Sequence, residues 1–220
     1  MKIARFIFRL FDINTYVVWD PSTGKAAVID PGMSSEDEEK ALQAFIEREK
    51  LEVSILINTH LHIDHACGNG FVMREYGVKA AANINDKPLG ESLKSQAREF
   101  MLDFEPQGTE ISTFLNDGDI VEIGEGKLKV LEVPGHSPGG IALYCEEDHF
   151  LLSGDSLFEG SIGRTDLPGG SYRQLINAVH EKLMTLPPKT VVYPGHGNPT
   201  TIGAELRNNP FLKGYDSDRQ

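Results

Sequence analysis

Four short apolar runs in this chain are each followed, within a few residues, by histidine or aspartate. The runs are residues 55–57, 130–133, 150–152 and 191–193, and the polar residues that follow them are His60, His136, Asp155 and His196. Runs this short and this apolar are typical of buried strands. Because loops that leave strand ends at one edge of a sheet can converge, the pattern predicts polar side chains gathered at one edge.

The first of these polar groups is part of a denser motif, His-x-His-x-Asp-His, which extends from His60 to His65. With it, the candidate ligands become five imidazoles and two carboxylates: His60, His62, Asp64, His65, His136, Asp155 and His196. Such donors suit zinc, iron or manganese. A closed structural zinc site uses four protein ligands, so seven donors predict two divalent metal ions, zinc first and iron or manganese as alternatives, with open positions for catalysis.

Other metal-binding residue types in the chain give weaker signals. His149 follows an acidic turn, and His180 lies beside the apolar face of a predicted helix, so we expect neither to act in the site. Cys67 comes two residues after His65. A free cysteine usually behaves as a small buried hydrophobe, and we expect that role for it.

The rest of the chain alternates strand-like and helix-like segments. A Pro-Ser-Thr-Gly turn at 21–24 predicts a hairpin of 13–20 with 25–30, and apolar residues at helical spacing predict a helix at 35–50. Further strands are expected at 1–10, 51–57, 119–123, 127–133, 141–145, 149–153 and 190–193, and further helices near 88–104 and at 171–185. The apolar residues of 88–104 would either cover the mouth of the site or join the core. This rhythm suits an α/β (α+β) fold of two packed sheets with helices outside.

Composition narrows the class of protein. A chain of 220 residues fits one domain, 1–220, and its net charge of −12 argues against non-specific nucleic-acid binding. Runs of about 18 apolar residues are lacking, so we expect no membrane span. The N-terminal segment is interrupted by Arg5 and Arg9 and lacks a small-residue cleavage site, so we expect a strand and not a signal peptide. Cys67 and Cys145 form no disulfide framework, which makes the cytoplasm the expected compartment.

The seven candidate ligands resemble those of the metallo-β-lactamase fold superfamily, and most of all its glyoxalase II branch. The resemblance spans nearly the whole chain and implies an αββα sandwich of two mixed sheets with a dinuclear site at one edge. It also implies a division of the ligands between the ions. One ion would be held by His60, His62 and His136, the other by Asp64, His65 and His196, with Asp155 bridging them.

Smaller features bear on the branch. The stretch from Gly154 to Asp166 is similar to both glyoxalase II-like hydrolases and persulfide dioxygenases. Common β-lactamases place a cysteine ligand where Asp155 stands, and flavodiiron reductases carry glutamate at the position of His62 and an added flavin domain. Single-domain glyoxalase II-like proteins share the loop at 161–166 and the Asn-Pro-Phe-Leu run at 209–212, so we expect no C-terminal helical glutathione-binding domain.

This resemblance implies a hydrolase that cleaves a small-molecule thioester such as S-lactoylglutathione or a related acyl-thiol. Asp64 and Asp155 would be the catalytic residues and would hold a hydroxide that bridges the ions. Arg164 matches a glutathione-contacting position, although it could equally pair with Asp166. Asp166 and Asn198 stand where the family has glutathione-contacting tyrosines; Asn198 is a candidate substrate contact, and the carrier thiol stays open.

Two other classes of function, an oxidoreductase and a non-catalytic metal-binding protein, could use such a donor set. A persulfide dioxygenase would use a single iron on His60, His136 and Asp155, a two-histidine, one-carboxylate set that leaves positions for oxygen. A non-catalytic metal-binding protein is disfavoured, because open coordination positions serve no structural purpose.

Overall fold

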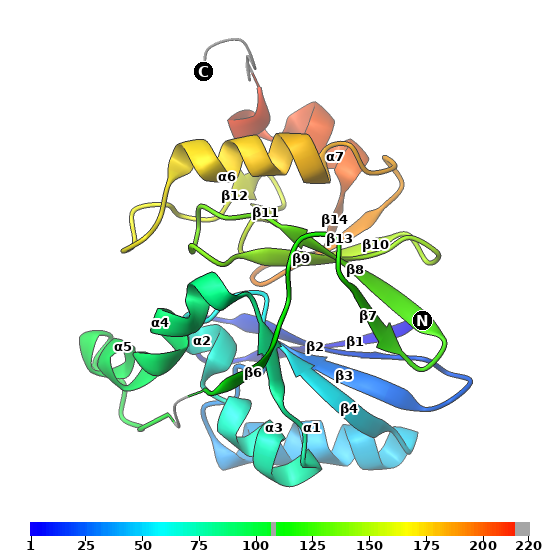
Figure 1. The fold of residues 1–220 in the computed structure, drawn as a ribbon, viewed down its shortest axis with the longest axis vertical. Coiled ribbons are helices and arrows are strands. Elements are labelled where there is room, and N and C mark those ends of the chain that lie inside the picture. The colour runs from blue at the N-terminus through cyan, green and yellow to red at the C-terminus, as the bar shows by residue number, and fades with distance from the viewer. Residues whose placement is uncertain (107–108, 214–220) are drawn as a thin grey trace.

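Two mixed sheets face each other, and helices cover the outer face of each (Figure 1). The computed structural model describes residues 1–106 and 109–213. The α1 and α3 helices lie beneath the first sheet in Figure 1, and α6 and α7 lie above the second. The predicted sandwich of two sheets with helices outside is therefore confirmed.

The first sheet contains the N-terminal strands in the order β1-β2-β3-β4-β5-β6. Their bounds are Lys2–Phe8, Ile13–Trp19, Lys25–Ile29, Glu52–Ile57, Ala80–Ala82 and Ile111–Phe114. The first three strands pair antiparallel, which confirms the predicted hairpin of β2 and β3. The remaining pairs are parallel, so the carboxyl ends of β3, β4 and β5 share one edge.

The second sheet has the order β14-β13-β10-β9-β8-β7. In chain order, β7 is Ile120–Ile123, β8 Gly126–Glu132, β9 Ile141–Cys145, β10 Phe150–Gly154, β13 Val191–Pro194 and β14 Thr200–Thr201. Only β10 and β13 pair parallel, and both therefore end at the same edge. A separate small hairpin, β11 (Leu157–Phe158) with β12 (Ser161–Ile162), follows β10 directly.

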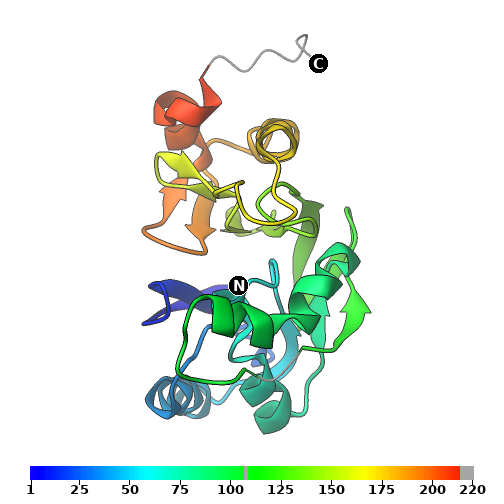
Figure 2. The ribbon, with the colours of Figure 1, turned by 90° about the vertical axis from the view of Figure 1, so that its left-hand side faces the viewer.

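The helices connect these strands. Their bounds are α1 Glu36–Glu49, α2 Ile63–Ala66, α3 Asn69–Tyr76, α4 Lys87–Glu91, α5 Leu93–Glu99, α6 Tyr172–Ala178 and α7 Ile202–Asn208. A 3-10 turn, Ile84–Asp86, precedes α4; a π-helical turn, Val179–Leu183, extends α6; and a second 3-10 turn, Pro210–Leu212, follows α7. Figure 2 looks onto the end of the sandwich where α4 and α5 lie.

The alternation of side chains along each strand builds three apolar layers. In β2, Tyr16 and Val18 face the second sheet and join the core between the sheets. The intervening Val17 and Trp19 pack on the outer face with Leu42 of α1. On the other side of the molecule, α6 packs on the outer face of the second sheet. Both faces of the central strands β2, β3, β9 and β10 are thus buried, which explains their near-continuous apolar runs in the sequence.

The predicted helix at 88–104 is wrong in its extent. The segment forms two short helices that meet at Ser92, and α5 ends at Glu99 because Met101 adopts a left-handed backbone with φ of 53°. The sequence did not predict α2, α3, α7, β5, β6, β14 or the small hairpin β11–β12. These elements are too short to show the apolar periodicity by which a helix or strand is predicted.

Within residues 1–106 and 109–213, helices are too short or too polar to cross a lipid bilayer.

We predict that Leu128→Ala destabilises the protein strongly. Leu128 is fully buried on β8 between the two sheets, so the substitution leaves a cavity and should lower the free energy of unfolding by about 2–5 kcal/mol. Chemical denaturation measures the loss. Leu206→Ala on α7, where the leucine is 45% exposed, is the matched control and should change stability by less than about 0.5 kcal/mol. Equal losses in the two variants would contradict this account of the core.

Candidate metal centre

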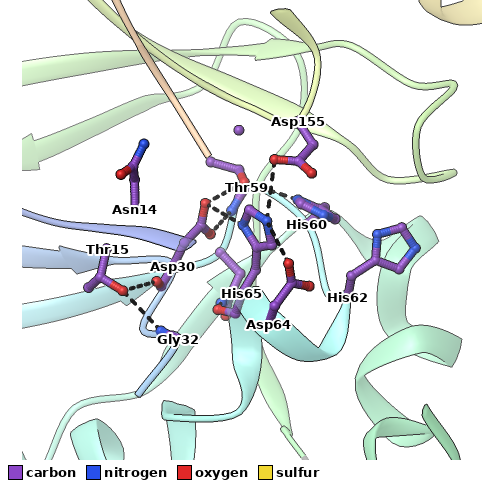
Figure 3. Close-up of polar contacts among 12 residues, drawn as sticks. Asn14, Thr15, Asp30, Gly32, Thr59, His60, His62, Asp64, His65 and Asp155 are labelled. Atoms are coloured by element: carbon purple, nitrogen blue, oxygen red, sulfur yellow. Dashed lines mark hydrogen bonds and ion pairs between the residues drawn. The ribbon is translucent and has the colours of Figure 1, made fainter. Parts of the chain in front are cut away.

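The seven residues predicted from the sequence come together between the two sheets at the edge where parallel strands end. His60, His62, Asp64 and His65 occupy the β4–α2 connection and the first turn of α2. The second sheet contributes the other three, one each from the loops after β8, β10 and β13: His136, Asp155 and His196. Figure 3 shows the imidazole of His65 between the carboxylates of Asp30, Asp64 and Asp155.

Three imidazoles form the first donor group. Nε2 of His136 lies 3.2 Å from Nε2 of His60 and 2.9 Å from Nδ1 of His62. His62 therefore presents the opposite ring nitrogen from the other two. The three nitrogens are close enough together to hold one metal ion.

The second donor group consists of Asp64, His65 and His196. Oδ2 of Asp64 lies 3.1 Å from Nε2 of His196 and 3.7 Å from Nε2 of His65. Asp155 lies between the two groups. Its Oδ1 is 3.3 Å from His65, and its Oδ2 is 3.6 Å from Nε2 of both His136 and His196.

Backbone oxygens fix two of the imidazoles from behind. Nδ1 of His136 donates to the carbonyl of Arg164 at 2.7 Å, and Nδ1 of His196 donates to the carbonyl of Phe11 at 2.9 Å. Each contact places the proton on Nδ1 and leaves the Nε2 lone pair facing the cluster, the arrangement usual for histidine ligands of metals.

Asp30 supports His60 and His65, two of the three ligand histidines that follow β4 of the first sheet. Its carboxylate accepts hydrogen bonds from the backbone N–H and the hydroxyl of Thr59, and Oδ2 lies 3.1 Å from Nδ1 of His65 (Figure 3). The same Thr59 hydroxyl lies 3.2 Å from Nδ1 of His60. Asp30 is buried with a left-handed φ of 51°, an unfavourable backbone for aspartate that these contacts offset. Sequence reasoning missed it, although it too directly follows a strand.

A second buried carboxylate, Asp86, ties the ligand loops of the two sheets together. It accepts from the backbone N–H of Leu61, which lies between His60 and His62. It also accepts from the hydroxyl of Ser137 at 2.8 Å and from the N–H of Gly139. Burial raises the pKa of Asp86, and these three donors oppose that rise. No sequence pattern marked this residue, because its partners are far away along the chain.

The loop that carries His196 is attached to β2 of the opposite sheet. The side-chain amide of Asn14 donates to the carbonyls of Pro194 and Gly197, and the hydroxyl of Tyr16 donates to Pro194 at 2.7 Å. Burial raises the pKa of Tyr16, so its hydroxyl stays a neutral donor. The position of His196 therefore depends on contacts between the sheets.

Two of the glycines that precede the ligands have separate physical roles. Gly135 has φ of 130°, which only glycine adopts readily, and turns the chain toward His136. Gly195 has an ordinary backbone, but a Cβ there would lie 2.2 Å from Oδ1 of Asp155 and 2.6 Å from Cε1 of His65. The close approach of this loop to the site thus requires glycine.

The ionisation of the cluster suits cation binding. Burial, reinforced by the neighbouring imidazoles, holds the pKa of His60 well below its usual value and lowers that of His62 to about 4, so both rings are neutral at neutral pH. Burial opposes ionisation of Asp64 and Asp155, but the imidazole of His65 outweighs it and lowers both pKa values. Neutral imidazoles and ionised carboxylates are the forms that bind metals. Burial opposes protonation of His65 and His196, but the neighbouring carboxylates outweigh it and raise both pKa values, so a cation bound there would displace a proton from each ring.

Three buried atoms in the cluster have no hydrogen-bond partner within the described part of the chain: Nδ1 and Nε2 of His65 and Oδ1 of Asp155. Of these, Nε2 of His65 and Oδ1 of Asp155 face each other. Leaving buried polar atoms unpaired costs about 1–3 kcal/mol each. A bound cation would pair with both, so the residues present fit the two-metal site expected from the sequence.

A cavity of about 630 Å³ opens onto this cluster and is lined by His62, Asp64, His136, Asp155 and His196. Arg164 also lines it, while its guanidinium pairs with Asp166 through two contacts of 2.8 Å. Asn198 is exposed and does not line the cavity, so the structure gives no support for a substrate contact there.

The remaining candidates lie apart from the donor groups. Cys67 is buried and donates to the carbonyl of Met33 at 3.4 Å, and burial raises the pKa of its thiol. Neither Cys67 nor His149 nor His180 belongs to a metal-ligating group among the described residues. This distribution agrees with the small buried role expected for Cys67.

The fold and the site define a metal-dependent hydrolase, and the comparisons agree. The model of the metallo-beta-lactamase superfamily matches residues 9–196, and the chain belongs to that superfamily. Hydroxyacylglutathione hydrolase GloC of Haemophilus influenzae is 37% identical over 219 residues, which cover 96% of this chain and 98% of GloC.

Solved structures share both the fold and part of the sequence. BLEG-1, a B3 metallo-beta-lactamase, superposes with a TM-score of 0.86 at 32% identity, covering 97% of this chain and all of BLEG-1. TTHA1623 in a di-iron-bound form superposes with a TM-score of 0.84 at 34% identity, and the match covers 95% of this chain and all of TTHA1623. ETHE1 from Myxococcus xanthus superposes with a TM-score of 0.80 at 27% identity, and the match covers 98% of this chain and 86% of ETHE1.

We predict that Asp30→Asn weakens metal binding by about 10–100-fold, because His65 loses the carboxylate behind its ring. Competition with a chromophoric chelator measures the affinity, and circular dichroism checks the fold. Asp37→Asn, an exposed change in the first turn of α1, is the control and should bind metal as the unmodified protein does. Unchanged affinity in Asp30→Asn would show that this contact does not position the ligand.

Proposed function

We propose that this chain is a dinuclear metal-dependent hydrolase that cleaves a small-molecule thioester within one domain. The observation that carries the proposal is the presence of two complete donor groups with Asp155 between them, at the bottom of a cavity. The similarity to GloC, a hydroxyacylglutathione hydrolase, over nearly the whole of both chains supports a thioester such as S-lactoylglutathione or a related acyl-thiol.

The ligands divide between the ions as the donor groups do. The imidazoles of His60, His62 and His136 would hold one cation. Asp64, His65 and His196 would hold the other, and Asp155 would contact both. Zinc is the first choice for this donor set, and iron and manganese remain alternatives, iron also because TTHA1623 is described in a di-iron-bound form. Cations of this kind polarise a carbonyl and lower the pKa of bound water from 15.7 to about 7.

The chain's own residues position the reactants. Asp64 and Asp155 have lowered pKa values, so they stay ionised and can accept a hydrogen bond from the attacking water. The contacts of His65, His136 and His196 with oxygens behind their rings keep the donor atoms in place through turnover. The thioester would reach the cluster through the cavity, which His62, Asp64, His136, Asp155 and His196 line.

A second candidate is a mononuclear-iron persulfide dioxygenase. Similarity to ETHE1, a persulfide dioxygenase, favours it, and His60, His136 and Asp155 also lie together in this structure. That reaction needs only one metal ion, but the ligand motif alone does not exclude it, because such dioxygenases keep much of the motif. The similarity to GloC at 37% identity over nearly the whole of both chains favours the hydrolase.

We predict that the purified protein carries about two metal ions per chain and releases thiol from S-lactoylglutathione. Metal analysis, thiol release and oxygen uptake with a persulfide should be measured on the same preparation. Treatment with a chelator should abolish thiol release, and added Zn²⁺ should restore it. One iron per chain with oxygen uptake would instead establish the dioxygenase, and cleavage of a chromogenic β-lactam without thioester hydrolysis would indicate a reaction like that of BLEG-1.

We also predict that Asp155→Ala loses one of the two ions and at least about 100-fold in kcat, since this carboxylate lies between the two donor groups. Metal analysis together with thioester hydrolysis measures both effects. Asp119→Ala, at an exposed turn before β7, is the control. Full metal content and full activity in Asp155→Ala would refute the bridging role.

A further inference from the structure

The walls of the cavity outside the donor groups are largely apolar. They are formed by Phe11, Leu89, Phe100, Phe158, Leu167 and Pro168. These residues come from five separate segments: the β1–β2 turn, α4, the end of α5, β11 and the loop after β12. A single exposed hydrophobic residue is an ordinary surface feature, but apolar side chains that meet from five segments form a continuous wall of the kind found in ligand pockets.

Aromatic rings stand close to the site of reaction. The ring centroids of Phe158 and His196 lie 6.4 Å apart, with an angle of 71° between the ring planes. Phe158 also follows Asp155 by only three residues. Phe11 and Phe100, which both line the cavity, contact each other edge to face with their ring centroids 5.4 Å apart. An apolar group attached to the thioester carbonyl would therefore meet these rings directly.

The charges at the mouth do not favour anions. Arg164 is the only lysine or arginine among the described residues that line the cavity. Asp166 forms a bidentate pair with it, and the hydrogen bonds from Arg164 lower the pKa of Asp166 to about 2, so the carboxylate stays ionised. Glu99, also in the lining, adds a further negative charge. A glutathione thioester carries carboxylates at both ends of its peptide, and neither would find an unpaired cation here.

Two of the neutral polar side chains of the lining are already engaged within the protein. Gln96 accepts from the N–H of Ile63 and donates to the carbonyl of Leu89, both at 2.9 Å. The hydroxyl of Ser92 donates to Leu89 as well. Among the neutral polar residues, Ser95 alone is left to contact a hydroxyl such as that of a lactoyl group.

From this lining we infer that the substrate is a thioester that is uncharged and carries an apolar acyl group, aromatic or branched. Phe100 and Phe158 are the residues that select it. The inference rests on the proposed function and narrows its substrate. Among acyl-thiols it favours uncharged ones, whose apolar acyl group would be buried in the cavity, over the charged glutathione thioester.

Four thioesters test the inference: lactoyl and phenylacetyl, each on glutathione and on N-acetylcysteamine. Thiol release by the zinc-loaded protein gives kcat/KM, and each value is divided by the rate of hydrolysis of the same ester in hydroxide. Burial of the phenyl group should favour phenylacetyl-N-acetylcysteamine over S-lactoylglutathione by about tenfold or more. A preference for S-lactoylglutathione overturns the inference and leaves the proposed function standing. Failure to hydrolyse all four overturns both.

Substitution of the aromatic rings tests their part in selection. Phe100→Ala and Phe158→Ala should each lower the ratio of phenylacetyl to lactoyl kcat/KM by about fivefold. Phe114→Ala is the matched control, because Phe114 is 47% exposed against 40% for Phe100 and lies outside the cavity lining. An unchanged ratio in both variants overturns the assignment. Phe11 is left intact, because its backbone carbonyl holds His196.

A substitution expected to improve substrate binding tests whether the exposed Arg164–Asp166 pair disfavours anionic substrates. Asp166→Asn should free the guanidinium of Arg164 and lower the KM for S-lactoylglutathione about two- to fivefold, with no change for lactoyl-N-acetylcysteamine. Arg164→Gln in the same background should reverse the gain. If Asp166→Asn affects both esters equally, or neither, the pairing does not exclude anionic substrates and the charge argument fails.

Discussion

The lone pairs of imidazole nitrogens and carboxylate oxygens repel one another, yet this protein holds seven such groups within contact distance in a largely buried space. Nε2 of His136 has the donor atoms of His60 and His62 within 3.2 Å and that of Asp155 at 3.6 Å. A bound cation would share these lone pairs, and contacts from behind hold the ligands in place for it. The rest of the structure supplies that support through Asp30, the carbonyl groups and the glycines of the ligand loops.

The support crosses between the sheets, and so the metal centre and the fold depend on each other. One sheet supplies four ligands and the other three, and neither set could bind two ions alone. Asn14 and Tyr16 of the first sheet hold the loop of His196, and Asp86 joins the loops of His60 and His136. Packing of the core between the sheets therefore sets the spacing of the donor groups. In the proposed function, the apolar cavity wall selects the thioester.

The candidate ligands could be predicted because each has a metal-binding side chain and most follow an apolar run typical of a buried strand. His60 to His65 form a dense local motif, and His136, Asp155 and His196 each follow an apolar run. The supporting residues could not be predicted in this way. Asp86 contacts Ser137 and Gly139 across more than 50 residues of chain, so its role leaves no local pattern. The helix predicted through Phe104 ends instead at Glu99, where Met101 adopts a left-handed backbone that the apolar spacing does not reveal.

By itself, the sequence determined the candidate ligands and the order of strand-like and helix-like segments, because residue chemistry and apolar periodicity are properties of short segments, and its resemblance to a known superfamily supplied the family and the sandwich fold. Tertiary structure alone decided which ring nitrogen of His62 faces the cluster, which carboxylate supports His65, and that Arg164 pairs with Asp166 in the cavity wall. It also decided that Asn198 lies outside that wall. Such facts depend on distances between residues remote in the chain, and those distances exist only once the two sheets have packed.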